Sequence, residues 1–123
     1  MTDNKQAALD FLNLVTSGKI DEAYIKHVDM NGKHHNLYFA AGFPILKQGM
    51  KDNEKEFPNK KFTVKHVVSD GDLVAVHSHV VLKAAELEIA VVHLLRFADG
   101  KIVEMWDCGA QIPADCPNTD GVF

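Results

Sequence analysis

The sequence predicts a single α+β domain in which helices come first and an antiparallel sheet follows. Apolar residues recur at helical spacing through the first half of the chain, and from residue 61 onward they alternate with a period of two. Because the two patterns are separated along the chain, an α+β fold is favoured over a repeated βαβ unit. The length of 123 residues fits one domain, which we place over residues 1–123.

The start of the chain carries the signals of two helices joined by a short turn. Asp3 can cap the first helix, with Gln6 three residues later as its partner, and Gly18 stops it. Residues 20–27 fit a second, shorter helix because their apolar side chains again fall on one side. These two helices are expected to supply part of the core.

A third helix is predicted where Gly42 and Pro44 punctuate its start and Pro58 ends it. Its inner stripe comprises Leu46, Met50, Asn53 and Phe57. The stretch from Asp29 to Lys33, before this helix, contains Asn and Gly and is predicted to be irregular.

Four strands are predicted to follow as an antiparallel meander. Ser69 to Asp72 includes an Asp-Gly pair that is typical of a tight hairpin turn, and Ala98 to Gly100 forms a similar turn. Residues 84–86 form a looser connection. The predicted strands cover residues 61–68, 73–83, 87–97 and 101–108.

Side-chain alternation assigns the faces of the last two strands. With Arg96 and Glu104 facing solvent, His93 and Asp107 point inward from neighbouring strands. We expect a three-residue loop at 98–100, because a two-residue turn would pair residues that belong on opposite faces. His93 then lies diagonal to Asp107 and within reach of it.

The turn at Asp70 determines the faces of the preceding strand. If Asp70 and Gly71 form a two-residue turn, His77 and His79 point inward, and a one-residue slip reverses this assignment. The outer face then holds a row of apolar residues: Val74, Val76, Val80, Val92, Leu94 and Trp106. A sheet face open to water is normally polar, so we expect a second copy of the chain to cover this row in a symmetric dimer. A sheet that closes further on itself is the alternative.

Composition and charge argue against two classes of partner. The formal net charge is −4 and no long Lys/Arg cluster is present, so no nucleic-acid partner is expected. The longest apolar run is about five residues, which is too short to span a membrane. No apolar signal segment follows the first residues, and a cytoplasmic location is expected.

Three segments of the chain are typical of a known family. They are His34–Phe39, Asp70–Val80 and Val91–Asp107, the last ending in Asp-Gly-Lys-Ile-Val-Glu-Met-Trp-Asp. With these motifs the chain resembles the SnoaL-like polyketide cyclases of the nuclear transport factor 2-like superfamily. The resemblance implies a cone-shaped fold whose N-terminal helices pack in a curled antiparallel sheet around a hydrophobic pocket. It also implies a homodimer through the outer sheet face and chemistry that needs no cofactor.

The resemblance transfers roles to individual residues. Asp107, in the terminal Trp-Asp pair, matches the family's acid-base aspartate, and His35 matches the histidine that precedes Asn in the pocket-lining stretch. The chain departs from the family at His93, where many relatives have an aspartate. We therefore expect Asp107, His93 and His35 to catalyse a proton transfer in a cyclisation, an isomerisation or an aldol-type reaction. The expected ligand-binding residues are His34, Tyr38, His77, His79, Met50 and Met105.

Two other interpretations stay open. The pocket could bind a small, mostly apolar molecule without catalysing a reaction, and the sequence does not separate a binding module from an enzyme. A metal site is the second alternative, because His77 and His79, with His93 on the next strand, resemble the two-histidine pattern of cupins. Glu86 lies outside the cupin spacing, so neither a metal nor another cofactor is expected. The expected partners are a small-molecule ligand and a second copy of the chain.

Overall fold

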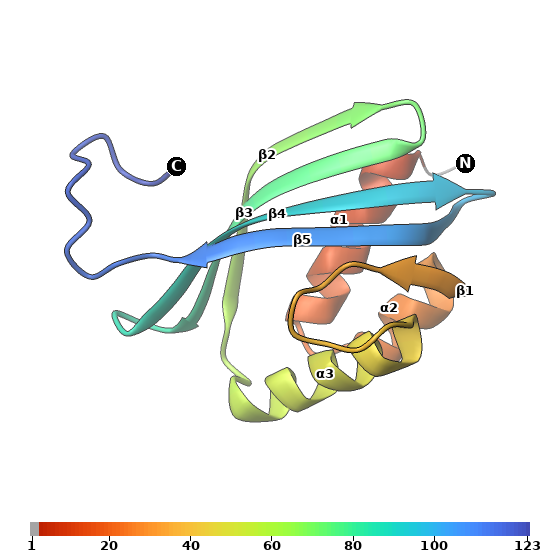
Figure 1. The fold of residues 1–123 in the computed structure, drawn as a ribbon, viewed down its shortest axis with the longest axis horizontal. Coiled ribbons are helices and arrows are strands. Elements are labelled where there is room, and N and C mark those ends of the chain that lie inside the picture. The colour runs from red at the N-terminus through yellow and green to blue at the C-terminus, as the bar shows by residue number, and fades with distance from the viewer. Residues whose placement is uncertain (1–2) are drawn as a thin grey trace.

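The computed structural model describes residues 3–123 as three helices and one curled five-stranded sheet (Figure 1). The helices are α1 (Asn4–Thr16), α2 (Ile20–His27) and α3 (Phe43–Glu56), and the strands are β1 (Val28–His34), β2 (Lys61–Asp70), β3 (Leu73–Lys83), β4 (Leu87–Ala98) and β5 (Lys101–Gln111). The strand order is β1-β5-β4-β3-β2. β1 runs parallel to β5 and the other neighbours are antiparallel, so the sheet is mixed.

The helices begin and end close to where the sequence predicted. The Asp3 carboxylate accepts a hydrogen bond from the Gln6 backbone N–H at 2.8 Å and so caps α1. α2 covers the predicted residues, and Pro44 lies in the first turn of α3. In Figure 1, α1 passes behind the sheet and α3 lies below it. None of the helices among residues 3–123 is long and apolar enough to cross a membrane.

The core lies between α1, α2 and the inner face of the sheet. Phe11 of α1 and Tyr24 of α2 are buried and meet edge to face, with ring centroids 5.5 Å apart. Leu95, Ile102 and Met105 cover them from the sheet, each at most 1% exposed. Burial of each large apolar side chain stabilises the fold by roughly 1.5–3 kcal/mol. The packing therefore fixes which face of each strand points toward the helices.

One strand was missed by the sequence analysis, because β1 covers the stretch that was predicted to be irregular. Most of its residues are polar, only its two end residues, Val28 and His34, are buried, and it pairs through its backbone with β5. Gly32 permits this approach, since a Cβ atom there would lie 2.3 Å from the carbonyl oxygen of Val103. The strand carries the chain directly into residues 35–40, which line the site described below.

The expected three-residue loop at 98–100 was also wrong. Ala98 pairs with Lys101, so the turn has two residues, Asp99 and Gly100, both with positive φ as such hairpins require. A bulge between Arg96 and Phe97 then shifts the register by one residue and restores the predicted faces. As a result His93 lies directly opposite Asp107 rather than diagonal to it.

The hairpin between β2 and β3 reverses the predicted faces of β3. Asp70 pairs with Leu73, so the two turn residues are Gly71 and Asp72, one position later than expected. His77 and His79 therefore point to the outer face, and the inner face of β3 holds Val74, Val76 and Ser78, each fully buried. The prediction of an outer apolar row was therefore wrong for the three β3 residues Val74, Val76 and Val80, which face inward. It was right for Val92, Leu94 and Trp106, which lie on the outer face.

Candidate functional site

A cavity of about 330 Å³ opens between α3, the loop at residues 35–40 and the inner face of the sheet. Its apolar lining consists of Val15, Phe39, Leu46, Met50, Val80, Leu82, Ile89 and Val91. A second hollow of about 340 Å³ shares Asn36, Tyr38 and Asp107 with the first, so the two adjoin. An apolar cavity with a few polar groups on its wall is the usual form of a small-molecule site.

Asp107 and His93 stand side by side on the wall of this cavity. They are paired residues of β5 and β4, so both side chains leave the sheet on the same face. The amide Nδ2 of Asn36 donates a hydrogen bond of 2.7 Å to Asp107 Oδ2. Asn36 also lines the cavity, and its hydrogen bond fixes the orientation of the carboxylate.

His93 has one ring nitrogen, Nδ1, that is buried without a hydrogen-bond partner among residues 3–123. Burial lowers the pKa of His93, and the nearby negative charge of Asp107 opposes this shift in part. The ring is therefore neutral at neutral pH. An unpaired acceptor is better tolerated in a protein interior than an unpaired N–H, so the proton belongs on Nε2, the nitrogen that is not sealed off.

The lowered pKa of His93 predicts how the stability of the fold depends on pH. Because the pKa of His93 lies below its ordinary value of 6.5, the unfolded chain binds a proton more readily than the folded one as the pH falls through that value. The stabilisation that His93 gives by staying neutral is present above about pH 6.5 and is lost below it. Urea unfolding of the wild type and of His93→Gln should show their difference in stability changing in this direction. A difference that does not vary with pH would contradict a lowered pKa.

The loop at residues 35–40 is ordered by its own hydrogen bonds. The Asn36 backbone N–H donates to His34 Nδ1 at 3.1 Å, so the His34 proton is on Nε2, which donates to the Ala40 carbonyl at 2.9 Å. The Asn36 side-chain oxygen accepts from the Tyr38 N–H at 2.8 Å. His34, predicted to bind ligand, is buried and holds the loop instead of lining the cavity.

Phe39 closes the loop against α3. A Cβ atom at Gly49 would lie 2.4 Å from the Phe39 ring, so only glycine lets the ring pack so closely on the helix. Tyr38 and Met50, both predicted ligand-binding residues, line the cavity beside this contact. Met105, also predicted, is 1% exposed in the core and is absent from the cavity wall.

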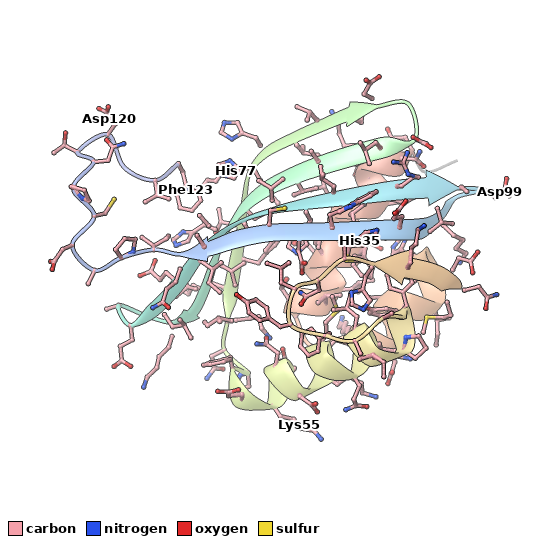
Figure 2. The ribbon with its side chains drawn as sticks, viewed as in Figure 1. His35, Lys55, His77, Asp99, Asp120 and Phe123 are labelled. Atoms are coloured by element: carbon pink, nitrogen blue, oxygen red, sulfur yellow. The ribbon has the colours of Figure 1, made fainter. Side chains whose placement is uncertain are left out.

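His35 does not reach the cavity, contrary to its predicted place there. It follows β1 immediately, and alternation turns its side chain to the outer face, as Figure 2 shows. Its ring stacks on Trp106 with centroids 5.0 Å apart, and Nε2 lies 2.7 Å from Glu104 Oε2. This hydrogen bond is the largest cause of the lowered pKa of Glu104.

His77 and His79 lie on the outer face as well, near the end of the chain. Phe123 packs against both rings, with centroids 5.4 Å and 4.8 Å away, and Figure 2 shows it beside His77. His79 Nε2 is 2.7 Å from Glu88 Oε1. Because His93 is on the inner face, the three histidines of the cupin-like pattern cannot share a metal ion. No group of three potential metal-ligating side chains occurs anywhere in residues 3–123.

Four polar residues of the 330 Å³ cavity were not identified as site residues from the sequence: Thr16, Asn36, Asn53 and Lys60. Asn36 lies in the same motif as His35. Side chains alternate along β1 and the residues after it, and this alternation determines that Asn36, not His35, points inward. Asn53 is the one polar member of the predicted α3 stripe, which is a signal that could have been used. Lys60 has no such signal, although its side chain is only 6% exposed and pairs with Glu54.

The chain belongs to the SnoaL-like polyketide cyclase family, since the model of that family matches residues 5–114. Its fold is that of the nuclear transport factor 2-like proteins, as the solved structures below and an NTF2-like protein from Cytophaga hutchinsonii indicate. No curated protein matches the sequence.

Many solved structures share the fold, and three of them illustrate its range at low sequence identity. AclR of Streptomyces galilaeus superposes with a TM-score of 0.72 at 23% identity, covering 85% of this chain and 86% of its own. A SnoaL-like polyketide cyclase from Agrobacterium tumefaciens has a TM-score of 0.72 at 17% identity, covering 89% and 93%. An LEH-like epoxide hydrolase from M. tuberculosis has a TM-score of 0.67 at 15% identity, covering 84% and 79%. A fold shared by such different proteins does not identify a reaction.

Proposed function

We propose that the protein binds a small, mostly apolar carbonyl compound in this cavity and catalyses a proton transfer next to the carbonyl without a cofactor. The observation that supports this proposal most strongly is the pairing of Asp107 with a neutral His93 on one wall of an apolar cavity. A carboxylate and a neutral hydrogen-bond donor, side by side and pointing the same way, are the two groups that enolisation requires.

In the proposed reaction, Asp107 removes a proton from the carbon beside the carbonyl. The electron pair of the broken C–H bond moves into the carbonyl group, and the resulting enolate oxygen accepts a hydrogen bond from His93 Nε2. Asn36 keeps the second carboxylate oxygen fixed throughout. In an unsaturated ketone, where the negative charge extends over a C=C bond, Asp107 returns the proton to a more distant carbon, which is an isomerisation. Alternatively, the enolate carbon attacks a second carbonyl of the same molecule. The C–C bond closes a ring, the π electrons of that carbonyl move to its oxygen, and this oxygen takes the proton from Asp107. The apolar walls strengthen each of these electrostatic interactions.

The test is the exchange of hydrogen for deuterium in a simple ketone. Methyl naphthyl ketone fits the apolar character of the cavity, and its methyl protons are the ones that enolisation exchanges. We expect the protein in D₂O to speed the loss of the methyl proton NMR signal well above the rate in buffer. Saturable binding with no exchange would instead favour the non-catalytic binding module, and catalysis would then be the wrong conclusion.

We also propose that the outer sheet face pairs with a second copy of the chain. Val68, Ala75, Leu94 and Trp106 are successive cross-strand partners from β2 to β5 and form one apolar row on that face. Val68 is 63% exposed in the single chain. Sedimentation at micromolar concentration should report a dimer for the wild type, and Leu94→Asp should be monomeric because it buries an unpaired charge in the interface. A monomeric wild type would contradict the proposal.

A further inference from the structure

Lys60 occupies an unusual place for a lysine. It lies between α3 and β2, its side chain is 6% exposed, and it is one of the residues that line the cavity. Its ammonium group is paired with Glu54, whose own side chain is 23% exposed and so keeps more contact with water. Lysine is seldom buried to this extent, and the arrangement calls for a reason.

The ammonium group has hydrogen-bonding capacity that the protein does not use. It carries three N–H donors, and the bond to Glu54 is the one it makes within residues 3–123. A buried donor without an acceptor costs free energy, more so when it is charged. The remaining donors therefore favour an acceptor that comes from outside the chain.

Asn53 adds neutral donors to the same cavity. Its side chain lines the cavity from α3 and makes no hydrogen bond to another side chain or backbone group in residues 3–123. Thr16, a further polar lining residue, donates its hydroxyl hydrogen to the Leu12 carbonyl at 2.8 Å. Unused donors thus come from Lys60 and Asn53, and the group that suits them has several lone pairs.

We infer that Lys60 and Asn53 bind a carboxylate of the ligand, so that the substrate class is an apolar keto acid. The inference rests on the proposed function, which puts the reacting carbonyl at Asp107 and His93. The Asp107 carboxylate repels a negative group from its own part of the cavity, and Lys60 attracts it, so the two charges orient the molecule. Glu54 offsets this attraction only in part, because its side chain is more exposed to water than that of Lys60, and water screens its charge more strongly.

The experiment compares two probes of similar shape that differ in charge, naphthoate and methyl naphthyl ketone, by calorimetric titration. We expect Lys60→Met to weaken naphthoate binding at least about tenfold, the size of a lost charge-assisted hydrogen bond, and to leave ketone binding within about twofold. Glu54→Gln, which keeps Lys60 and removes its counter-charge, should tighten naphthoate binding. In Lys60→Met alone, Glu54 is left as an unpaired carboxylate, which could itself weaken naphthoate binding. The double variant Lys60→Met with Glu54→Gln removes both charges, so any loss of naphthoate binding there comes from the missing ammonium group.

An equal loss of both probes in Lys60→Met and in the double variant would mean that the Lys60–Glu54 pair is only a structural clamp, and would overturn the inference. A wild-type protein that does not bind naphthoate would overturn it as well. The proposed reaction is tested separately by deuterium exchange into the ketone, which does not need Lys60. Selective naphthoate binding without exchange would leave the ligand class standing and remove the catalytic proposal.

Discussion

Asp107→Asn is expected to abolish the catalysed exchange of ketone protons while leaving the fold intact. Loss of a positioned base usually slows such a reaction by a factor of roughly a hundred or more. The asparagine oxygen can still accept the hydrogen bond from Asn36 Nδ2, so the free energy of unfolding should change by no more than about 1 kcal/mol. Exchange rates by NMR and urea unfolding measure the two effects on the same sample.

Glu104→Gln is the matched control, because Glu104 is on the same strand but faces outward. It bonds to His35 and Arg96 on the outer side of the sheet, so its loss should affect stability and leave the exchange rate within about twofold of the wild type. A variant Asp107→Asn that exchanges ketone protons as fast as the wild type would exclude Asp107 as the base.

Gly32→Val is expected to have the largest effect on stability of the substitutions considered. A Cβ atom at this position would lie 2.3 Å from the Val103 carbonyl oxygen and 2.9 Å from the ring of Phe43. The first atom belongs to the backbone of β5 and the second to a fully buried side chain, so neither can move aside cheaply. We expect a loss of about 3 kcal/mol or more in urea unfolding.

The same substitution should also disturb the site. β1 leads directly into the loop that holds Asn36, so separating β1 from β5 removes the hydrogen bond to Asp107. Met30→Val is the control, since Met30 lies in the same strand with 38% of its surface exposed. If Gly32→Val were as stable as Met30→Val, the close packing of β1 on β5 would be contradicted.

The parts of the site that could be predicted from sequence depend on short-range patterns. The cap at Asp3 and the helix-start signal at Pro44 are local, and each was confirmed. The inward direction of His93 and Asp107 followed from two charged residues, Arg96 and Glu104, that had to face water. These two form an ion pair on the outer face, with Nε and Oε1 3.4 Å apart.

The parts that failed depend on register, which a period of two does not determine. A bulge between Arg96 and Phe97 changed the pairing of β4 with β5, and a strict period of two does not predict where such a bulge falls. The hairpin turn lies one residue later than predicted, so His77 and His79 are on the outer face and not on the predicted inner face. β1 was missed because it is held by backbone pairing, which leaves no apolar pattern in the sequence. Without that strand, the alternation that turns His35 outward and Asn36 inward could not be predicted. The Asn36–Asp107 contact joins residues 71 positions apart and has no local signal at all.

The most direct test of the proposed site is a crystal structure of the protein with bound methyl naphthyl ketone. The proposal predicts the naphthyl ring among the apolar residues of the cavity and the carbonyl oxygen within about 3 Å of His93 Nε2. The methyl carbon should face the Asp107 carboxylate, with Asn36 still bound to its other oxygen. A ketone bound on the outer sheet face, or in the cavity with its carbonyl turned away from both residues, would contradict the account.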